Sequence, residues 1–103
     1  MSDLESLDQL LSGYLNEDWY LEYGDPWVAV EAFVREEPDY APSLRTDVQR
    51  AMAAADSDLE LERCLDSLGL GYAATTAGWD TYRNWLVAVA DRVEELLHKS
   101  PAA

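Results

Sequence analysis

The sequence predicts an all-α fold, a compact single-domain bundle of about five helices. Apolar residues recur at spacings of three and four along almost the whole chain, which is the period of an amphipathic helix. No segment forms a credible strand, and proline and glycine signals divide the periodic stretches into separate helices. The 103 residues, of which 49% are apolar, suffice for one domain with a modest core. We expect this domain to cover residues 1–100, followed by a frayed tail at 101–103.

The first helix is predicted to run from about residue 3 to residue 15. Ser2 and Glu5 have the spacing of a capping box, in which two side chains satisfy free backbone N–H groups at a helix start. The apolar stripe of this helix is formed by Leu4, Leu7, Leu11, Tyr14 and Leu15. Residues 16–24 show no clean period, so we expect a loop there that can include one turn of helix.

Asp25 and Pro26 mark the start of the second helix. An aspartate accepts a hydrogen bond at the N-cap, and proline fits the first helical position. The apolar positions that follow are Trp27, Val30, Phe33 and Val34. Pro38 ends this helix near Glu36 or Glu37, since the residue before a proline avoids the α conformation.

Two further helices are predicted between Pro42 and Gly69. Pro42 starts the third helix, and Ser57 with Glu60 gives a second capping-box spacing that starts the fourth. Their apolar positions are Leu44, Val48, Ala51, Met52 and Ala55, and then Leu61, Leu65 and Leu68. Gly69 is a natural left-handed stop, with Leu70 placed to complete a Schellman motif.

The last helix is predicted to follow a loop at residues 70–79. Asp80 is expected to cap this helix, which should run to about His98. Its apolar stripe repeats at three and four and consists of Tyr82, Trp85, Leu86, Val89, Val93, Leu96 and Leu97.

The acidic side chains are concentrated at one end of the chain. The net charge is −14, and the first forty residues carry eleven acids against Arg35 alone, a net charge of −10. From Asp3 to Glu31 there are eight acids and no base. Such a field repels nucleic acid and anionic membrane and favours encounter with a cationic partner. We therefore expect a basic protein partner, no nucleic acid and no membrane.

The segment from Asn16 to Trp27, N-E-D-W-Y-L-E-Y-G-D-P-W, alternates carboxylates with tryptophan and tyrosine. Aromatic rings supply contact area with little rotamer entropy to lose, so we expect this segment to bind the partner. The candidate contact residues are Asp18, Glu22, Tyr23 and Asp25, followed by Glu17 and Tyr20. The aromatic residues assigned to the core are Trp19, Trp27, Phe33, Tyr82 and Trp85. In the alternative interpretation Tyr23 also fills the core, and the carboxylates are merely solvated.

The sequence offers little for catalysis or metal binding. His98 is the only histidine and lies in a last helical turn, where the helix dipole favours a cation. Cys64 falls among leucines, which favours a buried structural thiol. Neither a catalytic triad motif nor zinc-ligand pairs occur, and Asp18, Glu22 and Asp25 do not follow the calcium-loop pattern. We expect no cofactor, no metal and no enzymatic activity.

Paired carboxylates could in principle serve an enzyme as acid and base. The pairs present are Glu17 with Asp18 and Glu36 with Glu37. Neighbouring residues of a helix point about 100° apart, so neither pair is expected to converge on a substrate.

Targeting signals are not evident. Cys64 is the only cysteine, so no internal disulfide can form, which fits a reducing compartment. The acidic N-terminus lacks the apolar region of a signal peptide, and no apolar run of about 18 residues occurs. We expect a cytoplasmic protein that is a monomer when free.

Three motifs occur in order along the chain. A leucine-rich stretch leads to Gly13-Tyr14 and then Asp18-Trp19. Residues 23–33 follow, reading Y-G-D-P-W-V-A-V-E-A-F, and residues 82–86 read Y-R-N-W-L. Together the motifs resemble the CdiI-type immunity proteins of contact-dependent growth inhibition, over residues 4 to about 90.

The resemblance implies a cytosolic protein that binds the C-terminal toxin domain of a large delivered effector and so protects the producing cell. Such toxins are often nucleases, whose basic clefts an acidic protein can occlude in place of phosphates. Leu15 and Asn16 stand where that family has an aromatic residue and a histidine, so its contact residues are not carried over. The alternative function is an acidic adaptor or nucleic-acid mimic that regulates a host DNA-binding protein.

Overall fold

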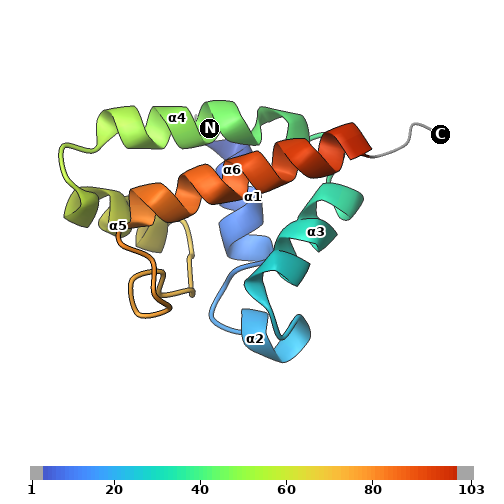
Figure 1. Cartoon of the computed structure of the whole chain (residues 1–103), viewed down its shortest axis with the longest axis horizontal. Helices are drawn as coiled ribbons and strands as arrows, with labels where there is room; N and C mark the ends of the chain where they lie inside the picture. The colour runs from blue at the N-terminus through green and yellow to red at the C-terminus, as the bar shows by residue number, and fades with distance from the viewer. Residues whose placement is uncertain (1–3, 100–103) are drawn as a thin grey trace.

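The computed structural model describes residues 4–99, which form six α-helices, one 3-10 turn and no strand (Figure 1). The elements are α1 (Glu5–Gly13), α2 (Trp19–Glu22), α3 (Pro26–Glu36), η1 (Ala41–Ser43), α4 (Leu44–Ala54), α5 (Asp58–Ser67) and α6 (Tyr82–Lys99). The all-α prediction is therefore confirmed, and α2 is the helical turn allowed within residues 16–24. The predicted cap Ser2 and the predicted frayed tail at 101–103 lie outside the described residues.

The longest helix, α6, forms the centre of the bundle. In Figure 1 it runs across the middle of the view, with α4 along one side, α3 along the other and α1 crossing behind it. Helices α3, α4 and α5 pack directly on α6, and α1 packs on α4. The short helix α2 lies at the lower edge of the view and contacts α3. Among residues 4–99, no helix has both the length and the apolar character that a membrane span requires.

The core is built around Trp85 and Phe33, the two largest fully buried side chains. They are surrounded by leucines from α1, α4, α5 and α6, which include Leu7, Leu10, Leu11, Leu44, Leu61, Leu65 and Leu86. Tyr82 is also buried, so these three predicted core aromatics are confirmed. Trp19 and Trp27, also predicted in the core, are only partly buried and pack against its margin.

The predicted start of α3 at Asp25 and the predicted end of α5 at Gly69 are both confirmed. The Oδ1 atom of Asp25 accepts a hydrogen bond from the backbone nitrogen of Trp27 at 2.7 Å and caps α3. At the end of α5, Gly69 has φ +102°, and the nitrogen of Leu70 donates to the carbonyl of Leu65 at 3.1 Å. That bond is the long bond of a Schellman motif, as the sequence predicted.

The predicted cap of α6 is wrong. The helix begins at Tyr82, so Asp80 lies too early, and the Oγ1 atom of Thr81 accepts from the backbone nitrogen of Asn84 at 3.0 Å. A second acceptor comes from α5. The two carboxylate oxygens of Asp58 accept from the nitrogens of Tyr82 and Arg83, at 3.0 and 3.1 Å. A carboxylate from another helix thus satisfies N–H groups that the local sequence leaves free.

Candidate partner-binding surface

Helix α2 is held on the bundle by two series of aromatic contacts. In the first, the Trp19 ring meets Tyr72 edge to face, with centroids 5.6 Å apart, and Tyr72 packs on the buried Trp85 at 5.2 Å. The indole nitrogen of Trp19 also donates to the carbonyl of Gly71 at 3.3 Å. One end of α2 is therefore connected to the core through the loop between α5 and α6.

The second series starts at the other end of α2. Tyr23 stacks on Tyr14 with ring centroids 6.1 Å apart, and Tyr14 meets the buried Phe33 edge to face at 5.7 Å. Trp19 and Tyr23 are four residues apart, so both lie on the inner face of the helical turn. The residues between them consequently face outward.

Gly71 allows the chain before α2 to pack tightly on the α5–α6 loop. Its backbone nitrogen donates to the carbonyl of Leu15 at 2.7 Å. A Cβ atom at this position would lie 2.5 Å from the backbone carbon of Asn16 and 2.5 Å from the nitrogen of Glu17. Because both neighbours are backbone atoms, any larger residue would push the two segments apart. The entry to α2 is thus fixed by a close backbone contact.

The outward face of α2 combines carboxylates with exposed apolar side chains. Tyr20 is 58% exposed and Leu21 is 71% exposed, and the neighbouring acids are exposed as well. We call this set the α2 surface; it consists of Glu17, Asp18, Tyr20, Leu21, Glu22 and Asp25. Large apolar side chains at such exposure, with exposed carboxylates at neighbouring positions of the chain, are typical of a protein-binding surface.

Five of the six predicted contact residues lie on the α2 surface, and the sixth does not. Tyr23 is partly buried against Tyr14, and burial followed by the nearby charge of Glu22 raises the pKa of Tyr23. Asp25 is exposed, but one of its oxygens caps α3. Leu21 was not among the predicted contact residues. Its position midway between the inward-facing Trp19 and Tyr23 indicates that its side chain points outward.

The basic residues that form ion pairs serve other parts of the bundle. Arg45 of α4 pairs with Asp91 at 2.6 Å and with Glu94 at 2.9 Å, both on α6. Arg92 of α6 pairs with Glu31 of α3 at 2.8 Å and with Glu95 at 2.5 Å. Within residues 4–99, no ion pair involves the acids of the α2 surface. In the part of the chain that the structure describes, ion pairs therefore do not neutralise the negative charge of this surface.

The carboxylates of Glu36 and Glu37 meet at the Tyr14 hydroxyl, so the expectation that the two side chains point about 100° apart is wrong, although the group they share is not a substrate. The Tyr14 hydroxyl lies 3.0 Å from Oε1 of Glu36 and 2.9 Å from Oε2 of Glu37, so its one proton serves two carboxylates. The expected divergence fails because Glu37 is the C-cap residue, with φ −122° and ψ 61°, and has left the helix. Burial first, and then these hydrogen bonds, raise the pKa of Tyr14. The pair is thus used to hold the Tyr14 ring in place.

His98 and Cys64, the other residues considered for catalysis or metal binding, do not belong to the α2 surface. His98 is exposed near the end of α6, and Cys64 is a free thiol that is partly exposed rather than buried. In the part of the chain that the structure describes, no group of three histidine, cysteine or acidic side chains could hold a metal ion.

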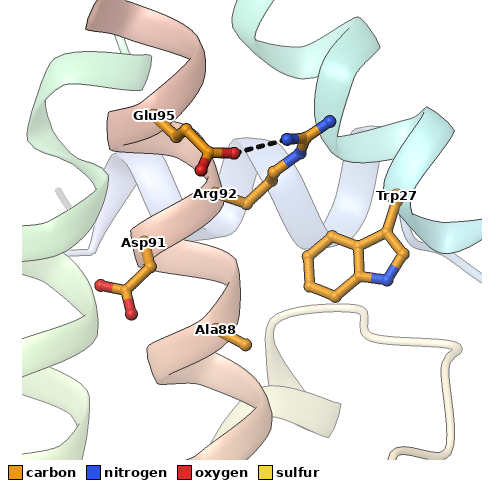
Figure 2. Close-up of a pocket in the computed structure, with 5 residues that line it drawn as sticks. All are labelled: Trp27, Ala88, Asp91, Arg92 and Glu95. Atoms are coloured by element: carbon orange, nitrogen blue, oxygen red, sulfur yellow. Dashed lines mark hydrogen bonds and ion pairs between the residues drawn. The ribbon is translucent and has the colours of Figure 1, made fainter.

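An open pocket of about 530 Å³ lies between α3 and α6. Figure 2 shows the Trp27 indole on one side and α6 on the other. The pocket is lined by Trp27, Ala88, Asp91, Arg92 and Glu95. Trp27 is not part of the buried core because it forms the α3 wall of this pocket, where it also meets Trp79 edge to face at 6.4 Å.

Comparison with known families identifies a match over most of the chain. The family model described as CdiI immunity protein matches residues 3–93. No curated protein and no solved structure shows significant similarity to the sequence.

Proposed function

Because this chain belongs to the CdiI immunity protein family, we propose that it neutralises its cognate toxin in the cytoplasm through the α2 surface. The toxin domain is bound stoichiometrically, and the acidic surface covers a basic cleft, most simply that of a nuclease. Inhibition by occlusion requires binding alone, so no catalytic residue is needed on the immunity protein.

The observation that carries the proposal is the exposure of Tyr20 and Leu21 on an acidic helical turn that aromatic contacts join to the core. Binding energy at protein interfaces is concentrated in a few large side chains surrounded by polar ones. A surface that is already ordered loses little conformational entropy when the partner docks. The aromatic contacts of Trp19 and the close approach at Gly71 supply that order.

Electrostatics supports a basic target. The protein carries a net charge of −14, and within residues 4–99 no ion pair involves the acids of the α2 surface. A basic cleft that has evolved to bind phosphates presents complementary charge, which accelerates association and selects the partner. Carboxylates of Glu17, Asp18 and Glu22 then occupy the place of substrate phosphates.

Co-purification tests the proposal directly. The protein is expressed together with the toxin domain encoded by the reading frame immediately upstream, and the complex is isolated at low salt. We expect a 1:1 complex whose dissociation constant rises as salt is increased, because exposed charges are screened. The absence of any complex would contradict the proposal and favour the acidic adaptor, for which a host DNA-binding protein should be recovered instead.

A further inference from the structure

The pocket between α3 and α6 has one aromatic wall and one acidic wall. Figure 2 shows the Trp27 indole broadside, with the edge of its six-membered ring toward α6, where Ala88 contributes only a methyl group. The carboxylate of Glu95 lies on the same side of α6 as Arg92 and Trp27, whereas the carboxylate of Asp91 points to the other side, toward α4. An open aromatic face beside a carboxylate is a favourable site for a cationic group, which the ring attracts through its quadrupole.

The charges of this pocket are not saturated. Glu95 uses Oε1 to pair with Arg92, which leaves its second oxygen for a further donor, and its side chain is 54% exposed. On this side of α6 the acids outnumber the bases by one, since Arg92 faces the carboxylates of Glu31 and Glu95.

Arg92 does not make the pocket an anion site. Its guanidinium is held between Glu31 at 2.8 Å and Glu95 at 2.5 Å, so its charge is already compensated by two carboxylates. An incoming anion would have to displace one of them. An incoming guanidinium can instead share Glu95 with Arg92 and lie flat against Trp27.

We propose that the α3–α6 pocket binds an arginine side chain of the toxin, stacked on Trp27 and hydrogen-bonded to Glu95. This inference rests on the proposed function for the identity of the partner. Arginine fits better than lysine because its planar guanidinium stacks on a ring and forks onto a carboxylate at the same time.

The position of the pocket supports a shared interface. Trp27 follows Asp25 of the α2 surface by two residues, and Val28, next to it on α3, is 45% exposed. The pocket is therefore connected to the α2 surface through the first turn of α3. A single partner can occupy both, with the α2 surface as one contact region and the pocket as a second.

The test uses a variant that fills the pocket. Ala88→Leu places a larger side chain on the floor of the pocket, and Asn84→Leu makes a comparable change one turn earlier on the exposed side of α6. We expect the dissociation constant for the toxin to rise about tenfold with Ala88→Leu and to stay unchanged with Asn84→Leu. Glu95→Gln, which keeps the shape of the side chain, should weaken binding in the same direction.

Alanine substitution of each toxin arginine identifies the inserted residue. Substitution of the inserted arginine should raise the dissociation constant for the unchanged protein. The same substitution should have no further effect on binding to the Ala88→Leu variant, because the two changes remove the same contact. Circular dichroism establishes that each variant is folded. If the complex forms and Ala88→Leu binds as tightly as the unchanged protein, the pocket proposal is overturned while the immunity function stands.

A second measurement does not need the toxin. N-acetyl-arginine amide is titrated into the protein, and the indole N–H resonance of Trp27, assigned with Trp27→Phe, is followed by NMR. We expect a saturating shift with the arginine derivative and none with the citrulline analogue, which has the same shape without the charge. Equal responses to the two compounds would overturn the arginine site whether or not a toxin complex is found.

Discussion

The Oδ2 atom of Asp47 on α4 accepts a hydrogen bond from the backbone nitrogen of Ser6 on α1 at 2.8 Å. The same oxygen accepts from the nitrogen of Leu7 at 3.1 Å, and Asp47 is only 4% exposed. The residue that precedes α1, Leu4, makes no side-chain cap of its own. A carboxylate 41 residues further along the chain therefore caps this helix and joins α1 to α4.

Removing this carboxylate should destabilise the fold. Asp47→Ala leaves two buried backbone N–H groups without an acceptor, which we expect to lower the free energy of unfolding by about 1–3 kcal/mol. Asp47→Asn keeps one acceptor oxygen and should cost less. Urea unfolding followed by circular dichroism measures both, and equal stabilities for alanine and aspartate would show that the bonds contribute nothing.

Gly71 should tolerate no side chain. Gly71→Ala places a methyl group 2.5 Å from backbone atoms of residues 16 and 17, so we expect a loss of about 1–3 kcal/mol and a shifted Trp19 indole resonance. Gly13→Ala is the matched control, since a Cβ there meets nothing within 4 Å. In the last turn of α1 this control should be neutral or slightly stabilising. A neutral Gly71→Ala would contradict the close approach.

Stability should fall in alkaline solution, in part through Tyr14. Burial first, and then hydrogen bonds to Glu37 and Glu36, raise its pKa in the folded protein, so the unfolded chain loses the proton first. Above about pH 10 the folded state binds more protons, and the free energy of unfolding decreases by at most about 1.4 kcal/mol per pH unit for this group.

Tyr14→Phe isolates that contribution. It removes the hydroxyl and should lower stability by about 0.5–1.5 kcal/mol at neutral pH, while making the alkaline decrease shallower. Tyr23 and Tyr82, whose pKa values are also raised by burial, account for the slope that is left. Urea unfolding at pH 9 and pH 11 provides the comparison. An unchanged slope in the variant would contradict the role assigned to Tyr14.

Charge reversal on the α2 surface should weaken toxin binding. Changing Glu17, Asp18 and Glu22 to lysine places positive charge against a basic cleft, so we expect the dissociation constant to rise at least about tenfold. The control changes Asp39, Asp56 and Asp66, three exposed acids elsewhere, to lysine and gives the same net charge. If both triple variants bind alike, only the total charge matters and the α2 surface is not the interface.

Tyr20 and Leu21 should contribute to binding without contributing to folding. Each is exposed, so truncation to alanine should change the free energy of unfolding by less than about 0.5 kcal/mol. At the centre of an interface the same truncation should cost more than about 1 kcal/mol of binding free energy. Leu59→Ala, at an exposed leucine of α5, serves as the control. Unchanged toxin affinity in both Tyr20→Ala and Leu21→Ala would remove them from the interface.

The sequence predicts those features whose cause is local. Asp25 beside Pro26, and Gly69 before Leu70, act on backbone atoms within a few residues, and the structure confirms both. The caps supplied by Asp47 and Asp58 cannot be found in this way, because donor and acceptor meet only after the helices have packed. Each of these aspartates looks like an ordinary helix residue until its neighbour in space is known.

In the candidate site, too, the features with a local cause could be predicted and those that depend on helix packing could not. The concentration of acids and aromatics between residues 16 and 27 indicated the region, and the spacing of Trp19 and Tyr23 fixes which side of the turn is inner. The role of Trp27 could not be predicted, since its helical spacing matches that of the buried Phe33. Only the packing of α3 on α6 shows that its ring borders a pocket.

The division of α2 into inner and outer residues determines which substitutions the fold can tolerate. Its inner residues, Trp19 and Tyr23, carry the contacts with the bundle, while Tyr20 and Leu21 between them touch mainly solvent. Substitutions at the outer positions can therefore accumulate without loss of the fold. On the interface proposed above, a change of toxin preference would then require substitutions at only a few neighbouring positions of α2.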